Sequence, residues 1–242
     1  EFRRVLFRSR YIIGIGQSGI GLDPEYYTHP NEQQKAVVAA YKSLNNDLLK
    51  MVGNAPAVAK KKMEAAFALE DRIAKVSYDQ VKSRDPQANY HPMTWEQLLK
   101  DYPGIDWNYL LKATGFPDNG GKVDVGQPEP VHEVEKILAT APLESLKAYM
   151  ELAVVSSAAG MLSDSFTDRK FEYTKVAYGV QQQQPRWKRA LSFVQGIMGE
   201  AVGKLYVQKY FPESSKQRMI ALVRNLQTAF AQRIEENTWM TA

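Results

Sequence analysis

Apolar residues after Pro130 recur every three or four positions in one segment after another, and this spacing constrains the fold more than any other feature of the chain. Residues at this spacing share one face of an α-helix, which turns once every 3.6 residues. Short breaks at proline and glycine separate the segments, as is typical of helices that pack as antiparallel neighbours. The pattern predicts helices over 130–140, 143–162, 165–178, 186–209 and 214–238.

The last two of these segments carry the clearest apolar stripes. We expect Trp187 to face inward at the start of its stripe, because an apolar helix face is normally buried. The first stripe consists of Trp187, Leu191, Val194, Met198, Val202 and Leu205, and the second of Met219, Leu222, Leu226, Phe230 and Ile234.

Helix signals also run through the first part of the chain. Asn31 can cap a helix that continues to about Met51, and Gly53 ends it. A second long helix begins near Pro56, and we expect it to close at Pro86, because residues before a proline leave the helical region. The positions that recur in it at three- and four-residue steps are Met63, Phe67, Glu70, Ile73 and Val76.

Two shorter helices are expected next. Thr94–Gln97 fits a capping box, in which the threonine and glutamine side chains each bond the other residue's backbone N–H, and this helix should continue through Lys100. The second should extend from Asp106 to Ala113 and stop at Gly115.

Strand signals are few. Tyr11–Gly16 is a short apolar run with β-branched residues, which indicates an edge strand, and Lys122–Val125 is the other candidate. Glycines and prolines between residues 14 and 30 indicate a long turn region. No apolar run approaches the ~18 to 20 residues that a membrane-spanning helix requires. The predicted class is mainly α, with several helices and one or two short N-terminal strands.

The first nine residues require separate treatment. Glu1–Ser9 has no apolar core of the kind a signal peptide carries, and its back-translation matches a common short-read sequencing adapter. We therefore interpret residues 1–9 as a cloning or assembly scar and residues 10–242 as the folded region. The nine residues contain three arginines and one glutamate, so leaving them out lowers the net charge from +4 to +2. A basic balance this small does not indicate a nucleic-acid or anionic-lipid partner.

Histidine spacing predicts no metal site in this chain. His132-Glu133 begins like a zinc-peptidase motif, but such a motif needs a second histidine four residues later, on the same helix face. That position holds Lys136, a cation that would repel the metal, so an exposed helix surface is the better interpretation. His29 and His91 each precede a proline in an expected loop. The absence of cysteine excludes thiolate ligands and cysteine nucleophiles.

Two other motifs have simple structural explanations. Gly14–Gly19 has the letters of a dinucleotide-binding fingerprint, but Pro24 and Pro30 follow, so the required helix cannot start at the third glycine. Arg186–Arg189 is a basic tetrad with an aromatic residue, but its helix lacks the further cations of a nucleic-acid footprint. Adjacent acids such as Glu70 and Asp71 point about 100° apart on a helix and do not converge on a substrate.

Ordered sequence blocks resemble a known peptidase family. The most specific block consists of Arg186–Arg189, Met198-Gly199, Ala201–Val207 and Phe211, followed by Phe230 and Trp239-Met240. It is similar to the Trp-Arg/Lys-Arg … Gly-x-Leu-Tyr-Val … Phe segment of neprilysin and endothelin-converting-enzyme-type zinc metalloendopeptidases. Ala190 stands where animal members carry a cysteine, which resembles the bacterial oligopeptidase branch. Earlier blocks that fit are Gln17–Leu22, Tyr26-Tyr27, Leu69-Glu70, Arg84–Pro86 and Ile105–Trp107.

The resemblance implies a function for the longer protein and a smaller role for this chain. In the family, a helical cap restricts entry of short peptides to a zinc site built from His-Glu-x-x-His and a downstream glutamate. Residues 10–242 would then be the cap and its connecting helices, incomplete at both ends. The zinc ligands and general base would lie beyond residue 242, so no catalytic or metal-binding residue is assigned here, and the substrate-binding residues remain unknown.

The resemblance also implies partners and a location. The expected partners are peptide substrates and a C-terminal catalytic domain, with no nucleic acid, and the expected location is extracytoplasmic, in the periplasm or at the cell surface. By itself the chain is expected to bind no zinc and to be inactive. Composition alone also permits a stand-alone helical binding or scaffold protein without catalysis. A complete domain should unfold cooperatively, whereas a separated cap should expose apolar helix faces and aggregate.

Overall fold

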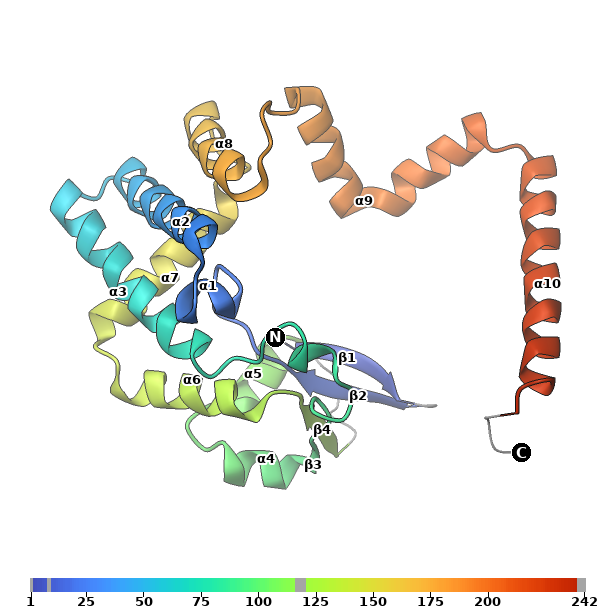
Figure 1. Ribbon diagram of the computed structural model, residues 1–242, viewed down its shortest axis with the longest axis horizontal. Helices are drawn as coiled ribbons and strands as arrows, with labels where there is room; N and C mark the ends of the chain where they lie inside the picture. The colour runs from blue at the N-terminus through green and yellow to red at the C-terminus, as the bar shows by residue number, and fades with distance from the viewer. Residues whose placement is uncertain (1, 8–9, 116–120, 239–242) are drawn as a thin grey trace. The chain divides into compact units, whose positions relative to one another are not determined.

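The computed structural model describes residues 2–7, 10–115 and 121–238, and the chain divides into two compact units (Figure 1). The first unit extends from Glu1 to Gln181 and the second from Gln182 to Ala242. Helices dominate both units, which confirms the predicted mainly-α class. In the first unit the helices are α1 (Pro24–Thr28), α2 (Glu32–Met51), α3 (Pro56–Ala74), α4 (Trp95–Asp101), α5 (Trp107–Ala113), α6 (Pro128–Thr140), α7 (Leu143–Ala158) and α8 (Asp164–Tyr178). The second unit contains α9 (Arg186–Tyr210) and α10 (Glu213–Glu235).

The predicted cap at Asn31 and the predicted capping box at Thr94 are both present, and the cap at Asn31 is also a full capping box. The Asn31 side chain accepts a hydrogen bond from the Gln34 backbone N–H at 2.8 Å, and the Gln34 side chain accepts one from the Asn31 N–H at 2.8 Å. Thr94 and Gln97 make the same reciprocal pair before α4. Each box satisfies backbone donors that have no partner in the first helical turn, so these short polar signals fix where α2 and α4 begin.

The strands form one mixed sheet in the order β1-β2-β4-β3. Strand β2 is antiparallel to β1 and parallel to β4, with Ile13 opposite Val123. The prediction that this segment is an edge strand was therefore wrong, because β4 covers its second edge. The prediction for β4 was confirmed, whereas β3 was not predicted. The bounds are β1 (Phe2–Phe7), β2 (Arg10–Ile15), β3 (Pro92–Thr94) and β4 (Lys122–Val125).

Helix α3 ends twelve residues before Pro86, which corrects the predicted boundary. Its last residue is Ala74, and only a 3-10 turn at Lys82–Arg84 follows. The Tyr78 backbone donates to the Gln17 side-chain oxygen at 2.8 Å and accepts from the Gln17 amide at 3.0 Å. These bonds occupy the Tyr78 N–H and carbonyl, which a continuing helix would use for its own backbone bonds. A second correction is α1, which lies within the region expected to be only turns.

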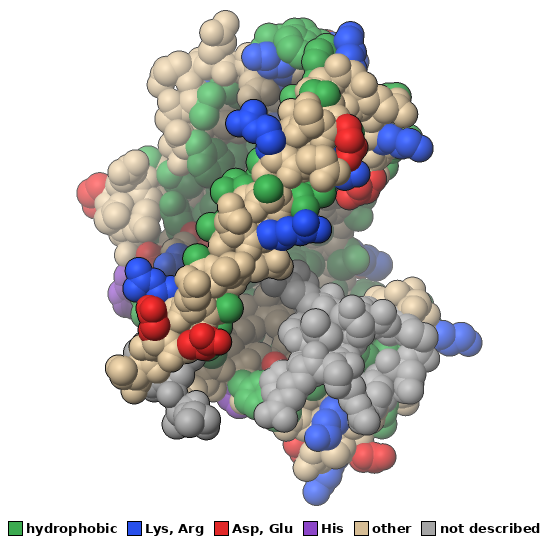
Figure 2. Space-filling model, turned by 90° about the vertical axis from the view of Figure 1, so that its right-hand side faces the viewer, with side chains coloured by type: hydrophobic (Ala, Val, Ile, Leu, Met, Phe, Trp, Pro, Cys, Tyr) green, Lys and Arg blue, Asp and Glu red, His purple; other side chains and the backbone are tan. Residues whose placement is uncertain are grey.

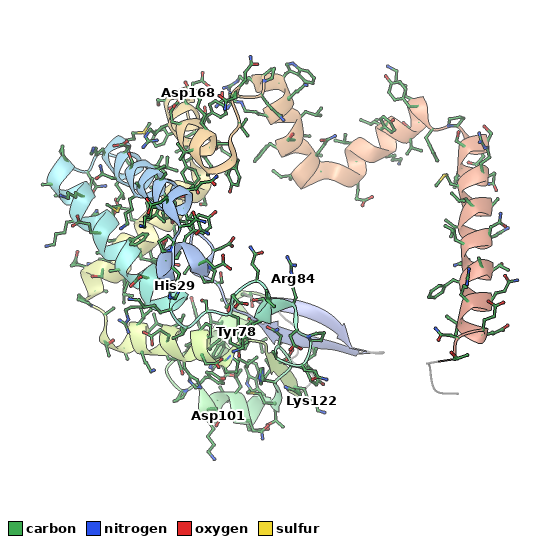
Figure 3. The ribbon with its side chains drawn as sticks, viewed as in Figure 1. His29, Tyr78, Arg84, Asp101, Lys122 and Asp168 are labelled. Atoms are coloured by element: carbon green, nitrogen blue, oxygen red, sulfur yellow. The ribbon has the colours of Figure 1, made fainter. Side chains whose placement is uncertain are left out.

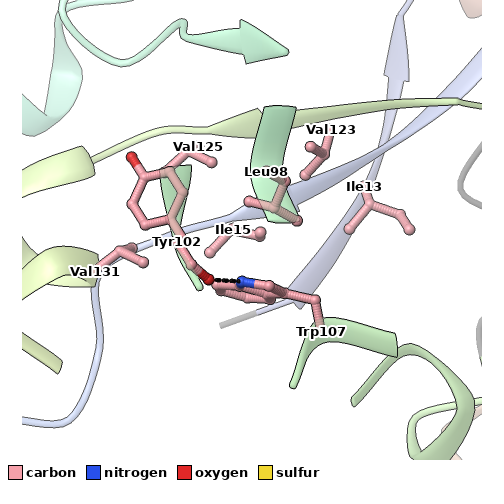
Figure 4. Close-up of a cluster of buried hydrophobic side chains, with 8 residues drawn as sticks. All are labelled: Ile13, Ile15, Leu98, Tyr102, Trp107, Val123, Val125 and Val131. Carbon is pink, nitrogen blue, oxygen red and sulfur yellow. Dashed lines mark hydrogen bonds between the residues drawn. The ribbon is translucent and has the colours of Figure 1, made fainter. Parts of the chain in front are cut away.

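The first unit has a helical core and a sheet core. In the helical core, α2, α3 and α7 pack together, and Leu48 and Leu49 are completely buried. Burying each leucine contributes roughly 1.5–3 kcal/mol. In the sheet core, α4 and α5 cover the strands, and the Trp107 indole donates to the Tyr102 carbonyl at 2.7 Å (Figure 4). The segment from residue 16 to 23 leads from β2 in the sheet core to α1 beside the helical core.

The second unit has no such core among its described residues. Neither α9 nor α10 contains a buried residue. Helix α9 is interrupted at Met198, whose backbone torsions of φ −124° and ψ 31° are not helical. Both helices were predicted from their apolar stripes. Their formation is confirmed, although nothing in the described part of this unit covers the stripes.

Candidate functional site

The loop between β2 and α1, residues 16–23, is fastened to distant parts of the first unit. In addition to its two bonds with Tyr78, Gln17 donates its backbone N–H to the Gln127 side-chain oxygen at 2.8 Å. Tyr78 lies beyond the end of α3 (Figure 3), and Gln127 is the residue before α6. The loop therefore has a defined position although it contains several glycines.

A buried carboxylate holds the second half of this loop and the helix that follows. Glu70 in α3 is only 6% exposed. It accepts a hydrogen bond of 2.7 Å from the Tyr27 hydroxyl and one of 2.9 Å from the Tyr41 hydroxyl. The Tyr27 oxygen in turn accepts from the Leu22 N–H at 3.3 Å. One acid thus joins α1, α2 and α3 and fixes the end of the loop.

Burial controls the protonation of this cluster. Burial raises the pKa of the Glu70 carboxyl, and hydrogen bonds from Tyr27, Tyr41 and the Gly21 backbone oppose the rise. Burial and the neighbouring Glu70 carboxylate also raise the pKa of the Tyr27 and Tyr41 hydroxyls. Both hydroxyls therefore stay protonated at neutral pH and act as donors. The cluster holds the backbone of the 16–23 loop in place, and its polar groups are hydrogen-bonded to one another.

Two glycines are required where the loop meets this cluster. A Cβ atom at Gly21 would overlap the Tyr41 hydroxyl. Gly19 has a positive φ of 93°, and a Cβ there would lie 3.2 Å from the Tyr149 hydroxyl. That hydroxyl donates to the Gly19 carbonyl at 3.0 Å. The glycines therefore allow the close approach of tyrosines from α2 and α7.

Sequence reasoning missed the Glu70 cluster, although one signal was available. Glu70 occupies a position in the repeating series of α3 that also contains Met63 and Ile73, both of which are buried. An acid at an inward-facing position of a helix requires buried donors, because an unpaired buried carboxylate is costly. The series does not show which donors these are, and the partners Tyr27 and Tyr41 come from other helices.

An apolar cavity of about 390 Å³ lies beside the same loop. The loop forms one wall, and the other walls come from α3, α5, α6 and α7 through residues such as Ile73, Trp107 and Ile137. Leu138 and Met150 line it and are 50% and 59% exposed. Most of this lining is hydrocarbon, which suits an apolar group, and the lining residues include no carboxylate, histidine or cysteine.

The histidines lie on separate elements. The His132 ring bonds the Glu135 carboxylate at 3.1 Å on the exposed side of α6, which confirms the interpretation as helix surface. The His91 ring lies 3.0 Å from the Val125 carbonyl, beside the sheet. His29 follows α1 (Figure 3). Within the described ranges, no group of three His, Cys, Asp or Glu side chains could hold a metal ion.

The two remaining motifs also have defined places. The Gly14–Gly19 segment leads from β2 into the loop, and the next helix begins only at Pro24. Trp187 is 63% exposed, so the prediction that it faces inward was wrong. The reason is that the described residues of the second unit supply nothing to pack against it. The Lys188 ammonium lies 5.5 Å from the centre of its ring.

Apolar side chains are exposed along both helices of the second unit. Leu205 is 67% exposed and Phe230 is 68% exposed. Figure 2 shows apolar side chains at the surface between Lys and Arg side chains. Patches of this kind usually mark an interaction site. None of the described helices is both long enough and apolar enough to cross a membrane. The exposed stripe residues are Trp187, Leu191, Val194, Met198 and Leu205 in α9, and Met219, Leu222, Leu226, Phe230 and Ile234 in α10.

Comparison with known proteins places the chain in a family. Residues 6–242 match the sequence model of Peptidase family M13. Endothelin-converting enzyme-like 1 of Mus musculus is 31% identical over 241 residues, which cover 97% of this chain and 31% of that protein. The Trp239-Met240 block of the predicted resemblance lies outside the described residues but within this matched range.

Solved structures agree with this placement. The zinc metalloprotease Zmp1 of Mycobacterium tuberculosis, in its open state, matches with a TM-score of 0.82 and 36% identity, covering 96% of this chain and 36% of that chain. PepO of Lactobacillus rhamnosis shares the fold, with a TM-score of 0.80 at 21% identity over 96% of this chain and 37% of that one. The chain thus spans about a third of the length of these relatives. It belongs to Peptidase family M13, as the resemblance to neprilysin-type peptidases predicted.

Proposed function

We propose that this chain is the helical N-terminal region of a zinc-dependent metalloendopeptidase that cleaves short peptides. In this proposal the region restricts access to the catalytic site and has no activity of its own. The observation that carries it is the match of residues 6–242 to the peptidase family, together with 36% identity and a TM-score of 0.82 to a zinc metalloprotease. Because the chain spans only about a third of such relatives, the catalytic groups are assigned to another part of the longer protein.

The side chains in the described part of this chain do not fit a zinc site. Catalytic zinc is held by three protein side chains within about 2.0–2.3 Å of the ion. His29, His91 and His132 lie on separate elements, and the last two rings have a carbonyl and a carboxylate as neighbours. We therefore assign the zinc to the catalytic part of the longer protein and derive no reaction step from the residues present here.

The exposed apolar stripes of α9 and α10 support a contact with that catalytic part. Exposed leucine, phenylalanine and tryptophan side chains gain roughly 25 cal/mol for each Å² of apolar surface that a partner covers. Both stripes run along most of their helices, which suits an extended interface better than a small-molecule site. We assign the C-terminal catalytic domain as the partner and peptides as the substrates, at an extracytoplasmic location.

Enzyme assays on two proteins test this function. The first is the present chain with added zinc, and the second is the longer protein encoded by the continuing reading frame. We expect the longer protein to cleave a short internally quenched peptide, and a zinc chelator to abolish the cleavage. The present chain should not cleave the peptide. Chelator-sensitive cleavage by the present chain would contradict the proposal. A stop codon directly after Ala242 would instead favour a helical binding protein.

The first nine residues are tested separately. We propose that Glu1–Ser9 comes from a sequencing adapter and is absent from the natural protein. The family match begins only at residue 6, after more than half of this segment. Sequencing the source DNA across this end provides the test. We expect the codons upstream of Arg10 in the source DNA to differ from the adapter sequence.

A further inference from the structure

Helix α9 changes direction at a single place. Figure 1 shows the bend in α9. Met198 has non-helical torsions in the middle of Arg186–Tyr210, and two glycines, Gly196 and Gly199, lie on either side of it. Sharp helix kinks have identifiable causes, among them proline, glycine pairs and inserted side chains. The helix contains no proline. Glycine fits a helix poorly because it loses more backbone freedom than other residues, so Gly196 and Gly199 weaken the helix on either side of Met198.

Among the residues that the structure describes, no tertiary contact fixes the angle of this kink. A Cβ atom at Gly196 or Gly199 would meet nothing within 4 Å. Helix α9 has no buried residue, and Ile197 and Met198 at the kink are 68% and 56% exposed. A kink inside a packed core is held by its neighbours, whereas here only the local backbone resists a change of angle. Without side chains at the two glycines, rotation at this point meets little steric resistance.

The kink divides the apolar stripe of α9. Trp187, Leu191 and Val194 lie before it, and Leu205 lies after it. A change of angle would turn the second half of the stripe relative to the first. The continuous helix α10 provides a contrast, because it contains no interior residue with non-helical torsions.

We propose that residues 196–199 form a hinge, and that bending there redirects the Glu200–Tyr210 half of α9 together with the apolar side chains it carries. This inference rests on the proposed function, because it gives the access-restricting region a means of adjusting its fit to the catalytic part. Hinges of this kind are formed by a few residues that absorb a backbone torsion change. The rest of each helical half moves as a rigid body.

Distance measurements between spin labels test the hinge in this chain. The chain contains no cysteine, so pairs of cysteines can be introduced without background labelling. Lys188→Cys with Gln208→Cys spans the kink, and Glu213→Cys with Arg233→Cys spans the same number of residues in α10. All four positions are exposed. A straight helix of this length gives a separation of roughly 30 Å, at 1.5 Å per residue. We expect a broad distribution with a shorter mean for α9 and a narrow one for α10.

Glycine-to-alanine variants separate the hinge from general helix stability. Gly196→Ala with Gly199→Ala should narrow the α9 distribution and lengthen its mean. Gly203→Ala is the matched control, because Gly203 lies in the same helix and a Cβ there also meets nothing within 4 Å. The Gly203→Ala variant should raise the helix content without changing the distribution of distances across α9. Circular dichroism confirms that each variant remains helical. An α9 distribution as narrow as that of α10, or an equal effect of Gly203→Ala, would overturn the hinge.

Peptide turnover by the longer protein tests the role of the hinge in access. The double alanine variant should reduce turnover several-fold at unchanged zinc content, whereas Gly203→Ala should not. If the distances show that the Glu200–Tyr210 half of α9 moves but the double alanine variant has unchanged peptide turnover, the role of the hinge in access is overturned. If the longer protein cleaves no peptide at all, the proposed function fails, whereas the distances still decide whether the hinge exists.

Discussion

The Tyr27 hydroxyl donates a hydrogen bond of 2.7 Å to the carboxylate of Glu70, 43 residues later in the chain. Tyr41 donates to the same carboxylate at 2.9 Å, and the carboxylate is almost inaccessible to water. Three helices and the end of the 16–23 loop therefore depend on one acid. Since buried polar groups are costly without partners, this cluster should contribute strongly to the stability of the first unit.

Removing the acid tests the cluster directly. Glu70→Ala leaves two tyrosine hydroxyls without an acceptor, and each unsatisfied group costs about 1–3 kcal/mol. We expect the free energy of unfolding to fall by about 3 kcal/mol in denaturant titrations. Asp71→Ala is the matched control, because its carboxylate pairs only with Lys75 at the surface. That change should cost less than about 1 kcal/mol. If both variants lose the same free energy of unfolding, the buried cluster contributes no more to stability than the surface ion pair.

The pH dependence of stability should carry the signature of Glu70. Because burial raises its pKa above the usual 4.5, the folded protein binds more protons than the unfolded chain between these two pKa values. Its contribution is fully present below the unfolded pKa and is lost as pH rises through the folded pKa. Relative to Glu70→Gln, the unmodified protein should therefore become less stable as pH rises through this window. Denaturant titrations at a series of pH values measure the difference.

Glu151 should give a pH dependence of stability with the opposite sign. Hydrogen bonds from Lys62 and Asn54 lower the pKa of its carboxyl. The stability it contributes is present above the unfolded pKa and is lost as pH falls through the folded pKa. Relative to Glu151→Gln, the unmodified protein should lose stability on acidification. If the stability differences for both variants change with pH in the same direction, the assignment for Glu70 is wrong.

A methyl group at residue 21 should disturb the loop. In Gly21→Ala the new Cβ overlaps the Tyr41 hydroxyl, so either the loop or the tyrosine must move away from Glu70. Overpacking of this kind costs about 1–3 kcal/mol. Gly126→Ala is the control, because its Cβ would make ordinary contacts at 3.6 Å and its φ is not positive. Thermal unfolding of both variants measures the effect, and a Gly21→Ala protein as stable as the unmodified one would contradict the close packing of residue 21 against Tyr41.

The exposed stripes of α9 and α10 should make the isolated chain associate. Replacing Leu191, Leu205, Leu222 and Leu226 with glutamine should reduce association while keeping the helices, because glutamine has a helix propensity close to that of leucine. Light scattering after size exclusion measures the mass. The control makes the same change at four exposed leucines of the first unit, Leu99, Leu138, Leu143 and Leu162. Association that depends equally on both sets would contradict a dedicated interface.

Deleting residues 1–9 should leave the fold intact. Strand β2 keeps its pairing with β4, and the buried Ile13 and Ile15 remain in the sheet core. We expect only a small loss in the free energy of unfolding, because the described buried residues of the sheet core come from β2, β4 and the helices that cover them. A large loss would show that the pairing of β1 with β2 contributes substantially to the fold, and it would count against the adapter interpretation.

Local sequence signals located most of the helices. The capping residues Asn31 and Thr94 marked the starts of α2 and α4, and apolar spacing located the helices from α6 to α10. Such signals act within a few residues, so they can be recognised without the rest of the fold. The end of α3 could not be recognised in this way, because the Tyr78 backbone groups that a longer helix would use are bonded to Gln17, 61 residues away in the chain. Strand β3 is only three residues long, too short to produce a pattern.

The sequence alone determined the mainly-α class and, through ordered blocks such as Arg186–Arg189, the membership of a peptidase family. Both depend on the order and spacing of residues along the chain. Only the tertiary structure decided that Glu70 is paired with Tyr27 and Tyr41, and that β2 lies inside the sheet. It also showed that Trp187 faces outward. These properties depend on which distant segments meet, because a side chain is buried or paired only by what the rest of the fold places against it.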